Sequence, residues 1–284
     1  MRLDQEDRST NIEDRRGTRM SPGLATGGIG TIAIILIGLF LGIDPSVLLQ
    51  GNPSVDTTHP PYSQQSGAND EMGDFVSRVL GSTERTWSEI FHRSGREYQP
   101  PKLVLFSGAV QSACGFARAA SGPFYCPEDY PEDYKVYIDL DFYRELRDRF
   151  HAPGDFAQAY VIAHEIGHHV QNQLGVMNRV REGQSRARQE QANALSVRLE
   201  LQADCLAGIW AYSANERRAI LEEGDIEEGL NAAAQIGDDR IQRRTQGYVV
   251  PESFTHGSAD QRVRWFRRGL ESGDLRQCDT FSRG

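Results

Sequence analysis

The sequence predicts an α+β protein in which a single N-terminal apolar segment precedes a domain whose second half is mainly helical. Two strand patterns, at residues 102–106 and 135–142, lie before a long region of helical periodicity that begins at residue 155. The 284 residues suffice for one sizeable core, and 38% hydrophobic with 25% charged residues is typical of a soluble globular domain. The net charge of −9 disfavours a nucleic-acid partner, because phosphate binding needs a concentrated basic surface.

The apolar segment is the first feature along the chain. Its densest part covers residues 27–43, and about 20 helical residues cross a hydrocarbon core of roughly 30 Å. We therefore expect a transmembrane anchor at 27–43 after an N-terminal tail at 1–26. A cleaved signal peptide and a buried core helix are the alternatives. The first lacks a small-residue cleavage site after the run, and the second lacks an amphipathic pattern.

Arginines set the expected orientation of this anchor. Several of them precede the apolar run, whereas no lysine or arginine follows it until Arg78. The positive-inside rule then places the N-terminus in the cytoplasm. Everything after the anchor is expected on the exported side, in the periplasm or outside the cell.

Cysteine usage agrees with an exported domain. Cys114, Cys126, Cys205 and Cys278 form no C-x-x-C pair, which disfavours a thiolate zinc ribbon or a redox dithiol. An even number of cysteines in an oxidising compartment predicts two disulfides, with three possible connectivities. We favour Cys114–Cys126 with Cys205–Cys278, because the first pair brackets one short loop. Four buried free thiols are the alternative.

The remaining elements follow in order. A linker rich in proline and polar residues is expected at 44–72, and the domain at 73–284. Its strands are predicted at Lys102–Phe106 and Lys135–Phe142. Its helices are predicted at 73–95, 155–173 (opened by a capping box of Asp155 with Gln158), 184–213, 216–223, 225–237 and 258–271.

The helix at 155–173 contains an H-E-x-x-H motif. His164 and His168 are four residues apart, which places both imidazoles on one helix face, one turn apart. Two imidazoles in that arrangement can bind a single zinc ion. Glu165 can reach a water at the metal without being a ligand. The motif alone also arises by chance, so a further ligand must support it.

A second helix supplies that ligand. Glu200 and Asp204 form an E-x-x-x-D pattern, in which Glu200 can be the third ligand. Asp204, one turn later, can accept the outer ring N–H of a ligand histidine. A metzincin site would need glycine and histidine at later positions, and Gln171 occupies the first of them. The alternative is that both acids belong to a solvated helix face.

Other candidate residues have weaker signals. His169 points about 100° away from His168, so we expect a packed side chain rather than a ligand. His256 lies in a turn before the last helix and could stabilise the negative charge that develops on a carbonyl oxygen. Tyr248 is the alternative for that role, and an ordinary loop histidine is the alternative for His256.

These motifs resemble the putative neutral zinc metallopeptidase family of bacteria over nearly the whole chain. The matching segments are Glu13–Gly17, Val110–Gly115, Gly122–Cys126, HEIGHHVQ at 164–171, ELQADC at 200–205 and Phe254–Ser258. The resemblance implies a single-pass bacterial membrane protein with an exported, zincin-like domain. It also implies zinc on His164, His168 and Glu200, a gluzincin-like set, with Glu165 catalytic. The segment around His256 is similar in position to one in the CAAX-processing and heat-shock membrane metallopeptidases.

The expected activity is zinc-dependent hydrolysis of peptide bonds. Zn²⁺ would polarise the scissile carbonyl, Glu165 would act as general base, and the peptide or protein substrate would lie along an exposed edge of strand 135–142. Two other hypotheses remain open. One is a zinc-bearing scaffold that binds envelope proteins without cutting them, and the other is a hydrolase of a non-peptide amide such as a cell-wall component. A disulfide-handling protein is disfavoured because C-x-x-C is absent.

Overall fold

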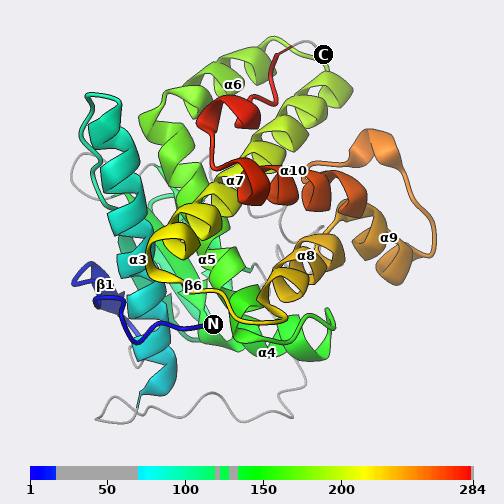
Figure 1. The fold of residues 1–284 in the computed structure, drawn as a ribbon. Coiled ribbons are helices and arrows are strands. Elements are labelled where there is room, and N and C mark those ends of the chain that lie inside the picture. The colour runs from blue at the N-terminus through cyan, green and yellow to red at the C-terminus, as the bar shows by residue number, and fades with distance from the viewer. Residues whose placement is uncertain (17–69, 119–121, 128–133, 283–284) are drawn as a thin grey trace.

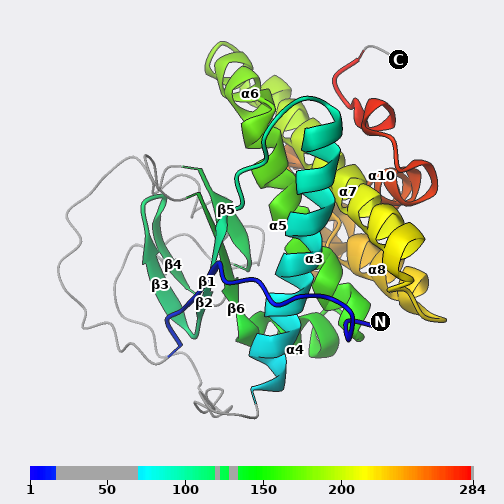
Figure 2. The same cartoon turned by 60° about the vertical axis from the view of Figure 1, so that its left-hand side comes forward.

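The computed structural model describes residues 1–16, 70–118, 122–127 and 134–282 (Figure 1). A four-stranded sheet in the order β1-β2-β6-β5 forms one layer, and helices pack against one of its faces (Figure 2). A short antiparallel hairpin, β3–β4, covers part of the other face. The strands are β1 (Ile12–Asp14), β2 (Lys102–Phe106), β3 (Ala109–Ser112), β4 (Gly115–Arg118), β5 (Phe124–Cys126) and β6 (Lys135–Asp139).

The two central strands are apolar on both sides because both of their faces are covered. Leu103 and Leu105 of β2 join the main core beneath the helices, whereas Val104 and Phe106 join a smaller core under the β3–β4 hairpin. This alternation explains the continuous apolar run of residues 102–106, which is typical of a strand buried on both faces. The α+β fold class and this strand agree with the prediction.

The N-terminal residues belong to this domain, which corrects part of the predicted tail at 1–26. β1 pairs in parallel with β2, with Ile12 opposite Leu103. Residues 1–16 therefore form an edge strand and its approach rather than a separate tail. The predicted anchor at 27–43 lies outside the described residues, as does the linker at 44–72 except for its last three positions. Within the described part of the chain, no helix combines the length and apolarity that a membrane span requires.

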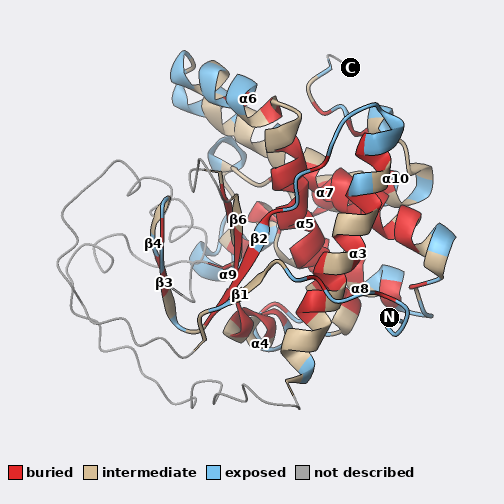
Figure 3. Ribbon diagram, turned by 90° about the vertical axis from the view of Figure 1, so that its left-hand side faces the viewer, coloured by how far each residue is buried: buried red, intermediate tan, exposed pale blue. Residues whose placement is uncertain are grey.

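Helices make up most of the second half, as expected. They are α3 (Glu71–Arg93), α4 (Leu140–Asp148), α5 (Asp155–Gln173), α6 (Val176–Ser185), α7 (Gln189–Arg218), α8 (Asp225–Gln235), α9 (Asp238–Gln246) and α10 (Ala259–Ser272), with short 3₁₀ turns at Pro251–Ser253 and Leu275–Cys278. Buried residues concentrate in α5 and α7, whereas α6 is largely exposed (Figure 3). The helix that carries the H-E-x-x-H motif is thus at the centre of the domain.

Several predicted boundaries were wrong for local reasons. The strand predicted at 135–142 ends at Asp139, because the Asp139 carboxylate caps α4 by accepting from the backbone N–H of Asp141. The predicted helix at 216–223 is absent, since α7 continues to Arg218 and then ends at Ala219, whose backbone φ is +49°. The capping box is also wrong, because Gly154 precedes α5 and makes no side-chain cap.

Both favoured disulfides are present, and one lies beside a close contact between two helices. Cys114 pairs with Cys126, and Cys205 of α7 pairs with Cys278. Beside that second bridge, α7 and α10 approach so closely that a Cβ added to Gly269 would lie 1.9 Å from the backbone oxygen of Cys205. The two helices can approach this closely because Gly269 has no side chain.

Candidate active site

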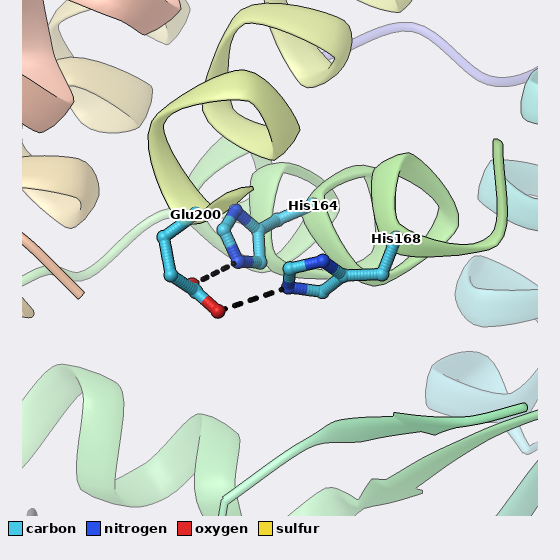
Figure 4. Close-up of side chains that lie close together, drawn as sticks. All are labelled: His164, His168 and Glu200. Atoms are coloured by element: carbon cyan, nitrogen blue, oxygen red, sulfur yellow. Dashed lines mark hydrogen bonds and ion pairs between the residues drawn. The ribbon is translucent and has the colours of Figure 1, made fainter. Parts of the chain in front are cut away.

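Three side chains from two helices converge on one point (Figure 4). His164 and His168 come from α5, and Glu200 comes from α7. The Nε2 atoms of His164 and His168 lie 3.1 and 3.3 Å from the two carboxylate oxygens of Glu200. One ligand atom from each residue lies within 4.8 Å of the others. The sequence-predicted ligand set is therefore assembled in three dimensions.

The Nδ1 atoms of both imidazoles have hydrogen-bond partners. These contacts fix the orientation of the two rings, with Nε2 toward Glu200. His164 Nδ1 lies 2.8 Å from Asp204 Oδ1, and a carboxylate can only accept, so Nδ1 donates. His168 Nδ1 lies 2.9 Å from Gln171 Oε1. The amide nitrogen of Gln171 is used elsewhere, because it donates to Leu199 O at 2.7 Å. Both Nε2 atoms therefore face the Glu200 carboxylate and are the ring nitrogens that would coordinate a metal ion bound beside it.

This donor set fits a zinc ion. Two histidine nitrogens and one carboxylate oxygen are the protein ligands of one class of catalytic zinc site, which keeps a further position open for water or substrate. The partners on each Nδ1 supply the outer hydrogen bonds that metal-bound histidines usually have. The residues present fit Zn²⁺, and the hydrogen bonds at both Nδ1 atoms need not change for them to hold it.

Sequence reasoning missed the buried cation that pairs with Asp204. Arg262 of α10 donates from Nε and from Nη2 to the two Asp204 oxygens, each at 2.9 Å. The Tyr160 hydroxyl also donates to Asp204. A signal was available: Arg262 lies on the buried face of α10, four and seven residues before the buried Phe266 and Gly269. A charged residue on such a face normally has a specific partner.

The electrostatics divide the acids of the site into two groups. Burial works against ionisation of Asp204 and Glu200, yet Arg262 and His164 hold the pKa of Asp204 below its usual value. For Glu200, His168 and His164 outweigh burial and hold the pKa well below the usual range. Burial instead raises the pKa of Glu165, which makes no such hydrogen bond to a cation. The pKa of Glu165 is thus shifted in the opposite direction from those of Glu200 and Asp204.

A cleft of about 330 Å³ opens onto these residues. His164, Glu165, His168 and Glu200 all line it. Further walls come from β5 and its approach, from α4, α6 and the loop before α10, and from other residues of α5 and α7. Among those wall residues are Gly122, Phe124, Tyr125, Met177, Thr255 and His256.

His256 lies in this cleft and is held from behind by Asp238. One Asp238 oxygen accepts the backbone N–H of Thr255 at 2.8 Å, of His256 at 2.7 Å and of Gly257 at 3.0 Å. The other oxygen lies 3.2 Å from His256 Nδ1. Tyr248, the alternative in the sequence, is 63% exposed and does not line the cleft. The structure thus brings His256 to the site and leaves Tyr248 outside it.

His169 packs on the side of α5 that faces the sheet, as predicted. It is fully buried, and its Nδ1 lies 3.1 Å from the Tyr125 hydroxyl while its Nε2 lies 2.7 Å from Gln99 O. Burial lowers its pKa to about 4, so the ring is neutral at pH 7. Because Tyr125 belongs to β5, His169 connects the edge strand to the metal-site helix.

The strand beside the cleft differs from the one expected. Residues 135–142 were predicted to offer an exposed edge, but β6 is an inner strand between β2 and β5. β5, three residues long, was not predicted at all. It is the outer strand on the cleft side, and its residues Phe124 and Tyr125 line the cleft.

Comparison with known proteins agrees with this site. A family model described as "Putative neutral zinc metallopeptidase" matches residues 1–281. The Escherichia coli protein named "Uncharacterized protein YpfJ" is 45% identical over 298 aligned positions, which cover 100% of this chain and 99% of that protein. The Mycobacterium tuberculosis protein named "Uncharacterized protein Rv2575" is 40% identical over 257 positions, covering 86% of this chain and 85% of that protein. No solved structure matches the chain. The chain belongs to the putative neutral zinc metallopeptidase family.

Proposed function

We propose that this protein is a zinc-dependent metallopeptidase that hydrolyses peptide bonds. The observation that carries the proposal is the placement of Glu165 beside three convergent ligands, all lining one cleft. A carboxylate next to the metal but outside its ligand set is needed for hydrolysis and has no use in a purely structural zinc site.

In the proposed reaction, the chain's own groups move one proton and stabilise one charge. Zn²⁺ supplies a Lewis acid that polarises the scissile carbonyl and lowers the pKa of water. Glu165 accepts a proton as the water oxygen attacks the carbonyl carbon. Glu165 then gives that proton to the amine nitrogen as the C–N bond breaks, so it ends the cycle ionised. His256, fixed by Asp238, is the candidate donor to the developing negative oxygen.

The proposed substrate is an extended peptide or protein segment that lies beside β5. An outer strand at a cleft can add one more strand, which is bound through its main chain, while wall pockets select side chains. Phe124 and Met177 contribute apolar wall surface in this cleft. We therefore propose a preference for apolar side chains next to the cleaved bond.

The proposed site of action is the exported side of a bacterial cell membrane. Two disulfides within one domain are expected in an oxidising compartment and are rare in the cytosol. Membrane association through the apolar run at 27–43 is part of this proposal.

Cleavage of a mixed peptide library by the zinc-loaded full-length chain in detergent tests the activity. Mass spectrometry would compare the parent with Glu165→Gln and with Glu190→Gln, an exposed position on α7 that serves as the control. We expect the same cuts from the parent and from Glu190→Gln, and none from Glu165→Gln, which should still bind zinc.

The same experiment separates the peptidase from the two other hypotheses. Zinc binding without cuts in any of the three proteins would leave a binding scaffold or a hydrolase of a non-peptide amide. Cuts that persist in Glu165→Gln would contradict the proposed role of Glu165.

A further inference from the structure

Residues 1–16, called here the N-terminal segment, run past α3 and then along the edge of β2 (Figure 2). Main-chain hydrogen bonds hold the segment along its length. Ser9 N donates to Ser77 O of α3 at 3.0 Å, Leu103 N donates to Asn11 O at 2.8 Å, and Arg15 N donates to Leu105 O at 2.8 Å. The segment therefore completes the sheet and covers a strand edge that would otherwise be open.

The surface of α3 is shaped for this segment. A Cβ added to Gly81 would lie 2.2 Å from the backbone oxygen of Asp7 and 3.2 Å from the backbone nitrogen of Ser9. Glycine is unfavourable inside a helix by roughly 1 kcal/mol relative to alanine. Its presence in the middle of α3 is explained by the close approach of the N-terminal segment.

Charges also match across this contact. Glu6 is 2% exposed and pairs with Arg218 of α7, whose side chain is 9% exposed. Arg8 pairs with Asp74, and Asp7 pairs with Arg85. The exposed pairs contribute little, but removal of Glu6 would leave Arg218 buried without its carboxylate, which is strongly destabilising.

The two described residues that flank residues 17–69 contact each other. Arg16, where the segment ends, places Nη1 3.2 Å from the Oδ1 of Asp70, the residue that caps α3. The chain between them contains the apolar run at 27–43. A single crossing of a bilayer would separate its two ends by a hydrocarbon core of roughly 30 Å. An ion pair between the flanking residues is incompatible with that separation.

We infer that the N-terminal segment lies on the same side of the membrane as the metal site, so that Arg16 and Asp70 are not on opposite faces of a bilayer. This inference replaces the orientation derived from the positive-inside rule. It does not depend on the proposed peptidase activity, since it rests on contacts of residues 1–16 alone.

Thiol labelling of the full-length chain tests the inference. All four native cysteines are in disulfides, so a single added cysteine provides the only free thiol. Asp7→Cys reports on the N-terminal segment, because the Asp7 side chain is 85% exposed. Arg276→Cys is the matched reporter on the domain, at a side chain that is 89% exposed. Each variant loses only one surface ion pair, which should leave the fold intact.

Each thiol would be assigned to one face with a membrane-impermeant maleimide. Right-side-out vesicles of bacterial cytoplasmic membrane expose the outer face, and inverted vesicles expose the cytoplasmic face. Labelling in detergent gives the total amount of reactive thiol. We expect Asp7→Cys and Arg276→Cys to react in the same vesicle orientation, or together in a soluble fraction. Reaction of the two thiols in opposite orientations would overturn the inference.

Discussion

Arg262 donates two hydrogen bonds of 2.9 Å to the carboxylate of Asp204, at the point where α10 crosses α7. Asp204 in turn accepts from the ring of His164 at 2.8 Å. Arg262 is 2% exposed and Asp204 is fully buried. The orientation of a candidate metal ligand is therefore controlled from the last long helix, some 100 residues away in the sequence, through one two-pronged ion pair.

Replacement of this arginine by lysine should weaken zinc binding. Arg262→Lys keeps the charge but loses the planar pair of donors, so Asp204 can no longer be held in one orientation. Loss of such an outer partner typically costs 10–100-fold in metal affinity, and we expect about 10-fold here. Competition with a chromophoric chelator would measure it, with Arg264→Lys, an exposed position on α10, as the control. Equal affinities in the two variants would argue against this role.

The contact between α7 and α10 should not tolerate one extra methyl group. A Cβ at position 269 meets the backbone of Cys205, which cannot move aside as a flexible side chain would. Gly269→Ala should therefore lower the free energy of unfolding by about 3 kcal/mol, the upper part of the range for overpacking. Gly183→Ala on α6 meets only the tip of Leu195, so its unfolding free energy should change by less than about 1 kcal/mol. Chemical denaturation of both variants would measure the difference.

Gly81→Ala should release the N-terminal segment without removing any of its charges. The added methyl would clash with the backbone of Asp7, so β1 should open more often. The amide of Leu103, which donates to the carbonyl of Asn11 directly before β1, reports on that opening through hydrogen exchange. We expect its exchange to be at least about tenfold faster, equivalent to about 1.4 kcal/mol. Unchanged protection of Leu103 would mean that the segment does not need the glycine.

Asp139 should make the protein less stable as the pH rises through about 6. Burial raises the pKa of Asp139 to about 6, and the carboxylates of Asp141 and Glu145 add to that effect. Because the folded pKa exceeds the unfolded value, the folded state binds the extra proton between about pH 4 and 6. The associated stability is complete below pH 4 and is lost as the pH rises through 6.

The matched comparison for this group is Asp139→Asn, which has no proton to lose. The advantage of the parent over the variant should shrink by up to about 3 kcal/mol between pH 4 and pH 7. Denaturation of both proteins with zinc removed would measure it. A difference that is independent of pH would contradict the assignment.

Sequence patterns sufficed for the features that depend on local spacing. The positions of His164 and His168 on one helix face follow from helix geometry alone, and Glu200 with Asp204 follows in the same way. The apolar run of β2 and the central parts of helices α5, α8 and α10 were long enough for their secondary structure to be predicted from the sequence. The two disulfides were chosen correctly among three pairings.

Contacts between distant segments could not be read in the same way. β1 and β5 are each three residues long, so they carry no usable periodicity and exist only through pairing with β2 and β6. The partner of Asp204 lies on another helix, and only the buried position of Arg262 hinted at it. The arginines near the N-terminus suggested a cytoplasmic tail, whereas in the structure Arg8 pairs with Asp74 of α3 and Arg16 pairs with Asp70, the N-cap of that helix.

The zinc content of purified variants tests the central claim most directly. Metal analysis of the full-length chain, after dialysis against zinc and then buffer, should give one zinc per chain for the parent and for Glu165→Gln. Glu200→Ala should contain far less, because it removes a ligand supplied by α7. Full zinc content in Glu200→Ala would contradict the site formed by His164, His168 and Glu200.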